Sequence, residues 1–269
     1  MIVRLESIHN AHRSALARPK REIIEARNRG HLGLAVALLT AIPACSQDKP
    51  RDLAEKSIED LMNMEVTSVS KKEQKLSSVA AAIFVITEED IRRSGATNIP
   101  DLLRMVPGLD VAQINANTWA ISARGFNLQF ANKLLVLIDG RTVYSPLFGG
   151  VYWDTQDVPP EDIERIEVVR GSGGTVWGAN AVNGVINIIT KKAADTQGGL
   201  LTGGGGTQAQ GFGTLQYGGK IKEDTNYQIF TKYLNEGHSP DLNGQNADDG
   251  WHLLHGGFRV DTSLSKKIP

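Results

Sequence analysis

The sequence predicts an α+β domain, with a small mixed sheet and short helices, followed by the opening antiparallel strands of a transmembrane β-barrel. Two observations predict this order. Residues 80–192 alternate short apolar runs with Gly, Pro and Asn, which is typical of a compact domain of strands and short helices. After Lys192 the runs lengthen and alternate between apolar and polar residues, as strands of a membrane barrel do. A soluble antiparallel sheet would give the same alternation.

The composition excludes several classes of protein. The 269 residues include 29 Lys+Arg and 30 Asp+Glu, so the overall charge gives no sign of a nucleic-acid partner, and we predict none. Hydrophobic residues make up 41% of the chain, too few for a bundle of membrane-spanning helices. Cys45 is the single cysteine, which excludes an intramolecular disulfide.

The N-terminal residues have the pattern of a secretory signal peptide. Residues 1–30 carry seven basic and three acidic side chains, and Leu32–Ala44 is a mostly apolar run too short to cross a bilayer as a helix. We therefore predict export, with a signal peptide at 1–46 whose basic n-region is extended, and a periplasmic linker at 47–64. The alternatives are an amphipathic N-terminal helix, lipid attachment at Cys45 and a start codon further downstream.

The first helices are predicted from the residues at their ends. Ala81–Ile86 is an apolar run that we predict as a buried strand, and it leads into Thr87–Asp90, a typical capped start of a helix. Gly95 ends this helix, and a second short helix begins at Asn98. Further strands, each bounded by Gly, Pro or Asn, are predicted at Leu109–Gln113, Trp119–Ala123, Leu134–Asp139, Ile163–Val169 and Val185–Thr190.

The residues after Lys192 predict longer strands. Gly198–Gly206 is rich in glycine, and alternating segments of about ten residues follow it, around 227–234 and 254–261. Apolar residues lie on one face of each segment and polar residues on the other: Tyr227, Ile229 and Tyr233 against Gln228 and Lys232, and Leu254, Phe258 and Val260 against His255, Arg259 and Asp261.

The sequence lacks the motifs of common enzymes. Gly171–Val176 lacks the third glycine of a dinucleotide site. Gly173 and Gly178 have the spacing of a phosphate-binding loop, but Ala179 and Asn180 stand where that loop needs Lys and Ser/Thr. The six histidines form no tight metal-ligand set, and there is no nucleophile elbow. We therefore predict no catalytic residues, no cofactor, no metal site and no enzymatic activity.

Four segments in order carry a resemblance to a known family. They are VPGLDV at 106–111, ISARGF at 121–126, LLVLIDGR at 134–141 and IERIEVVRGSGGTVWGANAVNGVINIITK at 163–191. Together they closely resemble the plug domain of TonB-dependent outer-membrane receptors. The resemblance is strong over 65–192, where we predict the plug domain. It is looser over 193–260, and we predict that 193–269 holds the first strands of an incomplete barrel.

The resemblance implies a gated transporter in the outer membrane of a Gram-negative bacterium. In that family the plug sits inside a 22-stranded barrel of the same chain and gates the uptake of a scarce ligand, such as a ferric siderophore, a cobalamin or a glycan. TonB, with its ExbB/ExbD energising complex, drives the uptake. The implied partners are therefore TonB, the barrel of the full-length chain and a small chelate or nutrient ligand.

One short segment resembles the TonB box, the periplasmic stretch that pairs with TonB as a strand. Its residues are Glu65, Val66, Thr67, Ser68 and Val69. A β-branched segment on a mobile leash can add an edge strand to a partner. The alternative is an ordinary first strand of the plug.

Two loops are candidates for the ligand face. Arg124 matches an arginine that the family often places near the substrate, and Phe126 and Asn127 continue that loop. The second loop is aromatic, and aromatic rings on a loop suit flat or partly apolar ligands. Its candidate residues are Tyr144, Phe148, Tyr152 and Trp153. In the alternative, these rings pack the plug against the barrel wall.

The charged residues of the predicted strand at 163–169, together with the arginine that follows it, face away from its isoleucines. By resemblance, such charges contact the inner barrel wall, where buried pairs hold the plug. They are Glu164, Arg165, Glu167 and Arg170. A solvated sheet face is the alternative.

The length of the chain departs from the family. Only about three or four strands are encoded, which cannot close a barrel and would leave unpaired edges. We therefore expect a fragment of a longer gene product. The alternatives are a soluble periplasmic binding or signalling module of plug fold that works without a barrel, and a truncated receptor without function.

Overall fold

The computed structural model describes residues 64–263 except 69–70, 72–73, 79–80 and 242. The signal peptide and almost all of the linker that the sequence predicts lie outside these residues, as do Cys45 and Val69. In the described ranges, no helix has the length and apolar character needed to cross a membrane.

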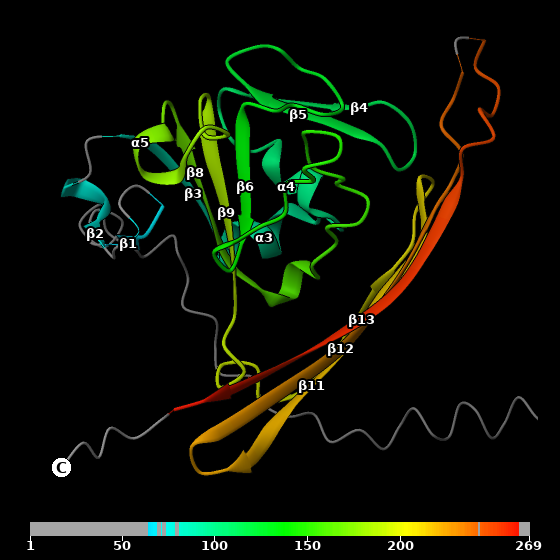
Figure 1. Cartoon of the computed structure of the whole chain (residues 1–269). Coiled ribbons are helices and arrows are strands. Elements are labelled where there is room, and N and C mark those ends of the chain that lie inside the picture. The colour runs from blue at the N-terminus through cyan, green and yellow to red at the C-terminus, as the bar shows by residue number, and fades with distance from the viewer. Residues whose placement is uncertain (1–63, 69–70, 72–73, 79–80, 242, 264–269) are drawn as a thin grey trace, which may run out of the picture. The chain divides into compact units, whose positions relative to one another are not determined.

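A mixed sheet forms the centre of the α+β domain, the part of the described chain up to residue 192 (Figure 1). Strands β6 and β9 run parallel and the other neighbours run antiparallel. The strands that the sequence predicted here are confirmed to within one residue at each end. In spatial order the strands are β3 (Ala82–Thr87), β8 (Ile163–Arg170), β9 (Gly184–Thr190), β6 (Leu134–Ile138) and β7 (Arg141–Thr142).

Two short helices follow β3, and both begin where the sequence predicted. The hydroxyl of Thr87 accepts the N–H of Asp90 at the start of α3 (Glu88–Ser94), and the Asp90 carboxylate accepts the N–H of Thr87 in return. Gly95 ends α3 with a φ of 68°, in the left-handed region that glycine adopts readily. Asn98 caps α4 (Ile99–Leu103) in a similar way.

The main hydrophobic core lies on one face of the mixed sheet. Helix α4 and the hairpin of β4 (Leu109–Gln113) and β5 (Trp119–Ala123) supply the side chains that cover it. Alternate residues of the same strands form a smaller cluster on the opposite face. The main core includes Ile86, Ile99, Leu102, Leu103, Ile166 and Ile188, and the smaller one Leu135, Leu137, Val169, Ala181 and Val185.

Several very short elements were not predicted from the sequence, apart from the first of them, which lies in the segment 65–69 where a first strand of the plug was the alternative. Near the start, β1 (Glu65–Val66) pairs with β2 (Gln74–Lys75), and the 3-10 helix η2 (Leu76–Ser78) follows. A second 3-10 helix, η3 (Pro160–Asp162), precedes β8, and the one-turn helix α5 (Gly174–Trp177) lies within the glycine-rich segment after it. Elements of two to four residues are too short to show a periodic pattern.

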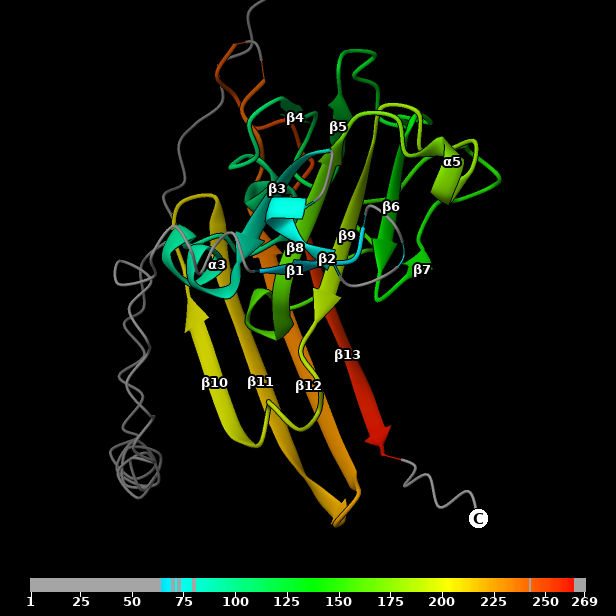
Figure 2. The ribbon, with the colours of Figure 1, turned by 90° about the vertical axis from the view of Figure 1, so that its left-hand side faces the viewer.

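The rest of the described chain forms an antiparallel sheet of four strands in chain order (Figure 2). One face exposes apolar side chains, with Leu254 70% and Phe258 81% exposed. The opposite face is polar and buried, with Gln228 1% and Lys232 3% exposed. The predicted alternation is therefore confirmed. The strands are β10 (Gly198–Gly204), β11 (Ala209–Lys222), β12 (Thr225–Glu236) and β13 (Trp251–Thr262).

Candidate functional site

A buried carboxylate on β8 holds the start of the described chain. Glu167 is fully buried, and its Oε2 atom accepts the backbone N–H groups of Thr67 at 3.0 Å and Ser68 at 2.9 Å. The hydroxyl of Ser68 donates to the same oxygen. Arg165 donates from Nε to the other oxygen at 2.9 Å. Charge-assisted bonds of this kind are about twice as strong as neutral ones, so Glu167 anchors this dipeptide firmly.

Further contacts dock the same segment. Val66 is 1% exposed and pairs with Gln74 of β2. The indole N–H of Trp177 donates to the carbonyl of Ser68 at 2.6 Å, and the ammonium of Lys71 lies 4.7 Å from the centre of the Trp177 ring. In this conformation the segment at 65–68 is thus a paired strand followed by a turn that is hydrogen-bonded to the domain, not a free, unpaired segment. Its role as a TonB box stays a prediction.

The predicted contact of Glu167 with a barrel wall is wrong. The face of β8 that carries Arg165 and Glu167 is the face on which the segment at 65–68 docks, so the carboxylate is enclosed within the α+β domain. Arg165 also pairs with Glu164, and Arg170 donates to the carbonyl of Pro107 at 2.8 Å. Wall contacts of Glu164, Arg165 and Arg170 stay predictions.

Other side chains bond the α+β domain to the polar face of the four-stranded sheet. Lys232 of β12 donates to the Asp157 carboxylate at 2.6 Å and to the carbonyl of Thr97 at 2.7 Å. Both partners of the ion pair are more than nine-tenths buried, so removing either would leave a buried charge uncompensated. The inward position of Lys232 follows from the alternation, but nothing local to Asp157 marks a partner 75 residues away.

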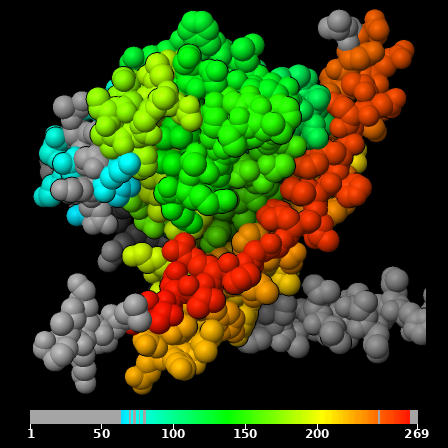
Figure 3. Space-filling model, viewed as in Figure 1, coloured from blue at the N-terminus to red at the C-terminus, as the bar shows by residue number. Residues whose placement is uncertain are grey.

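Two further contacts extend this bonding. Gln228 of β12 donates to Asp162 at 2.5 Å, and burial raises the pKa of the Asp162 carboxyl above its ordinary value. Arg259 of β13 donates to the hydroxyl of Thr190 at 2.8 Å. Figure 3 shows β13, in red and orange, along the surface of the α+β domain, in green. The sheet therefore meets the domain through hydrogen bonds and ion pairs as well as through buried apolar side chains such as Leu234.

The loop after β5 has a strained backbone. Arg124, Gly125 and Phe126 have successive φ angles of 60°, 87° and 58°. The left-handed conformation costs a residue with a side chain roughly 1–2 kcal/mol, and such strain collects at functional loops. Arg124 is exposed and donates to the carbonyl of Arg170 at 3.4 Å, and Phe126 is 79% exposed. Asn127 follows, half-buried. The loop thus presents a cation and an aromatic ring to the surroundings.

The second candidate loop forms an aromatic cluster with a residue that the sequence analysis missed. The ring of Phe130 lies 5.6 Å from that of Phe148 and 5.1 Å from that of Tyr152. Phe148 is 53% exposed, so the cluster is partly open. Tyr144 is half-buried nearby in sequence. Trp153 is only 6% exposed and belongs to the main core, so the prediction that places it on an open ligand face is wrong.

Metal-ligating side chains do not gather in the described part of the chain. In those residues, no group of three or more His, Cys, Asp or Glu is placed to hold a metal ion. His252 is exposed and His255 half-buried on β13, as expected for residues on opposite faces of a strand.

Comparison with protein families identifies the α+β domain. Residues 75–185 match the family model described as the TonB-dependent Receptor Plug Domain. The chain contains the plug domain of a TonB-dependent receptor. The resemblance found in the sequence is thereby confirmed, and the α+β domain is called the plug from here on.

The curated relatives are much longer than this chain. It is 35% identical over 147 residues to the vitamin B12 transporter BtuB of Vibrio vulnificus, a match that covers 54% of this chain and 23% of the relative. It is 34% identical over 152 residues to the vitamin B12 transporter BtuB of Vibrio cholerae, covering 56% and 23%. The match therefore spans about a quarter of each relative.

Solved structures share the fold of the plug and the strands after it. The ferric yersiniabactin uptake receptor FyuA of Yersinia pestis superimposes with a TM-score of 0.55 at 22% identity, over 68% of this chain and 29% of that one. The pyoverdine outer membrane receptor FpvA of Pseudomonas aeruginosa gives a TM-score of 0.55 at 21% identity, over 66% and 25%. The predicted fold class, a plug followed by antiparallel strands of a receptor barrel, is confirmed.

Proposed function

We propose that this chain is the plug and the first wall strands of an outer-membrane receptor that imports a scarce nutrient. The four-stranded sheet carries the proposal: Lys232 and Gln228 bond its polar face to the plug, while Leu254 and Phe258 are exposed on its apolar face. An apolar outer face and a polar inner face are typical of membrane barrel strands. A soluble module without a barrel would leave this apolar face in water, which disfavours that alternative.

The ligand is proposed to be a small chelate or nutrient of siderophore, cobalamin or glycan type, imported without enzymatic conversion. The similar proteins are named as a vitamin B12 transporter, a ferric yersiniabactin uptake receptor and a pyoverdine outer membrane receptor. Arg124, Phe126 and the aromatic cluster of Phe130, Phe148 and Tyr152 would form its contact face on the plug. Export would depend on the signal peptide predicted at 1–46.

TonB, energised by ExbB/ExbD, is proposed to bind the segment at 65–69 as an added strand. A strand supplies its main-chain N–H and C=O groups to such a partner. In the present conformation those groups of Thr67 and Ser68 are engaged by Glu167 and Trp177. The segment must therefore leave Glu167 before TonB can pair with it, so opening this contact is a step in energised uptake.

A proline substitution in the full-length receptor tests this assignment. Val66→Pro removes one N–H from the strand, and we expect it to abolish energised uptake while ligand binding at the cell surface is kept. Val66→Thr keeps the β-branched shape and the N–H, and should import normally. Uptake and surface binding would be measured with labelled cyanocobalamin and ferric siderophores. Normal uptake by the Val66→Pro variant would show that the segment at 65–69 is not the TonB box.

A further inference from the structure

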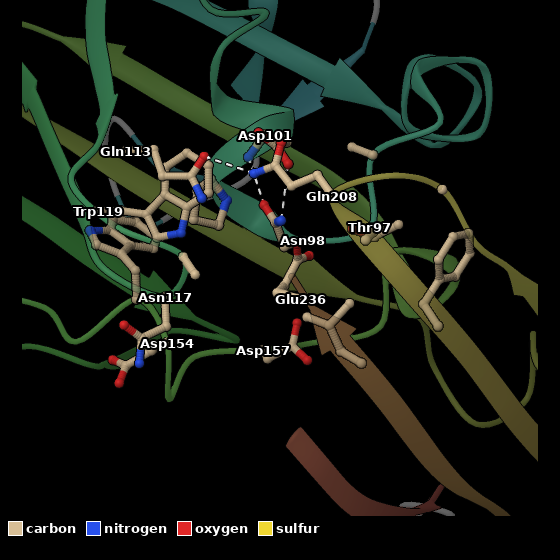
Figure 4. Close-up of a pocket in the computed structure, with 18 of the residues that line it drawn as sticks. Thr97, Asn98, Asp101, Gln113, Asn117, Trp119, Asp154, Asp157, Gln208 and Glu236 are labelled. Carbon is tan, nitrogen blue, oxygen red and sulfur yellow. Dashed lines mark hydrogen bonds between the residues drawn. The ribbon is translucent and has the colours of Figure 1, made fainter. Parts of the chain in front are cut away.

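A cavity of about 690 Å³ lies between the plug and the polar face of the four-stranded sheet (Figure 4). Helix α4, the β4–β5 hairpin and the segment at 153–157 line it from the plug, and strands β11 and β12 line it from the sheet. Its volume falls in the range of sites for small molecules. Trp153 is the one residue that it shares with the predicted ligand face, so it is a separate place in the molecule.

The charges that line this cavity do not balance. Four carboxylates line it, those of Asp101, Asp154, Asp157 and Glu236, with Arg104 as the one lining cation. Arg104 pairs with Asp101 at 3.1 Å, and Lys232, from the edge of the cavity, pairs with Asp157. Two cations against four carboxylates leave Asp154 and Glu236 without an ion pair among the described residues, and Lys232 acts on Glu236 only through space.

Glu236 is one of these two carboxylates, and it is the more deeply buried. Its side chain enters the cavity from the end of β12, toward α4 (Figure 4). The residue is only 8% exposed. Among the described residues its carboxylate has no hydrogen-bond or ion-pair partner, and the cation that acts on it electrostatically, Lys232, is already bonded to Asp157. A carboxylate buried this deeply is costly unless a cation or a hydrogen-bond donor compensates it. Asp154, half-buried on the plug side, is likewise without a bonded partner in the described ranges.

Aromatic rings line the same cavity. Three of the four tryptophans of the chain contribute to it: Trp119, Trp153 and Trp251. The guanidinium of Arg104 already lies 5.2 Å from the centre of the Trp119 ring. Aromatic faces attract cations, and rings together with carboxylates form the sites that recognise quaternary ammonium groups.

We propose that this cavity binds a small organic cation, with Glu236 as the carboxylate that compensates its charge. The surplus of two carboxylates supplies the charge complementarity, and the tryptophans supply the ring surface that distinguishes an alkylammonium from a hydrated inorganic ion. The proposal goes beyond nutrient uptake and does not depend on it, because none of the residues at 65–69, and none of the ligand-face residues other than Trp153, lines the cavity.

A pair of isosteric probes tests the charge requirement directly. Choline and its neutral carbon analogue 3,3-dimethylbutan-1-ol have nearly the same shape and differ in the charged nitrogen. We expect the 269-residue chain, in a neutral maltoside detergent, to bind choline at one site and at least about tenfold more tightly than the neutral analogue, as measured by calorimetry. Equal affinity for both probes, or no saturable binding of choline, would overturn the proposal.

A matched pair of variants tests whether Glu236 is the carboxylate that binds the cation. Glu236→Gln keeps the size of the side chain and should reduce the preference for choline to less than about twofold. Glu223→Gln makes the same change at an exposed position in the turn before β12, and should keep the full preference. A Glu236→Gln chain that still prefers choline tenfold would remove Glu236 from the site. The comparison of the two probes on the unchanged chain remains decisive if the variant does not fold, and neither outcome alters the test of uptake.

Discussion

At the scale of single residues, the most informative group is Glu167. A carboxylate that is fully buried 100 residues along the chain from Thr67 fixes that residue and Ser68 through their backbone N–H groups. Bonds to a charged acceptor contribute about 1.5–3 kcal/mol each. Opening of the segment at 65–68 should therefore be controlled more by this one side chain than by the two-residue pairing of β1 with β2.

Replacing Glu167 by Gln should loosen the segment locally. The amide keeps the size of the side chain but removes the charge. It also replaces one acceptor oxygen by an NH2 group, which donates hydrogen bonds where only acceptors are useful. We expect local opening to become easier by about 2 kcal/mol, which raises hydrogen exchange of the Thr67 and Ser68 amides by roughly 30-fold. Exchange would be followed by mass spectrometry on peptides that cover 64–71.

Glu164→Gln is the matched control on the same strand. The side chain of Glu164 is 40% exposed and pairs with Arg165, so its loss should change exchange little. If both variants exchanged alike, or if Glu167→Gln left the two amides as protected as before, the anchoring role of Glu167 would be refuted.

At the scale of elements, strand β9 depends on a glycine at its first position. A Cβ atom on Gly184 would lie 2.5 Å from the carbonyl oxygen of Val169 and 3.1 Å from a methyl group of Leu134. The first of these belongs to the backbone of the paired strand β8 and cannot rotate away. Gly184→Ala should therefore destabilise the plug by roughly 1–3 kcal/mol, the usual cost of overpacking, as measured by urea unfolding followed by tryptophan fluorescence.

A second glycine in the plug provides the control. At Gly174, in helix α5, the added Cβ would meet its nearest atom at 3.9 Å, which is ordinary contact. Alanine also suits a helix better than glycine, so Gly174→Ala should leave the stability unchanged or raise it slightly. An unfolding midpoint that falls equally in both variants would show that the tight approach at Gly184 does not matter.

The elements also show what the sequence alone can predict. Thr87, Gly95 and Asn98 are local signals, and they located α3 and α4 because a cap acts within a few residues. The position of Glu167 was not predictable in the same way. Strand alternation identified the face on which it lies, but which segment covers that face depends on residues 99 or more positions away. For the same reason Phe130 was missed and Trp153 was assigned to an open surface.

At the scale of the whole molecule, the main feature is that the two faces of the four-stranded sheet differ: one is polar and contacts the plug, and the other is apolar and exposed. The plug bonds to polar side chains that alternate, along β12 and β13, with exposed apolar ones. Paired residues such as Ile229 and Phe258 carry the apolar band from strand to strand. Such a band is stable only where its surroundings are also apolar, which a lipid bilayer provides. The alternation that the sequence shows thus assigns one face to the plug and, under the proposed function, the other face to lipid.

This assignment predicts that the cost in stability of a charged side chain on the outer face depends on its depth in the membrane. Phe258 is 81% exposed and lies within β13, whereas Thr262 lies on the same face at the end of the strand. Arginine at the middle of a membrane costs about 2–4 kcal/mol, against about 0–1 kcal/mol near the interface. Phe258→Arg should therefore lower the free energy of unfolding of the full-length receptor in lipid vesicles by about 2–4 kcal/mol. Thr262→Arg should lower it by no more than about 1 kcal/mol. Equal and small effects would mean that the exposed face of β13 contacts water or protein instead of lipid, and the arrangement of plug inside and membrane outside would then have to be abandoned for this chain.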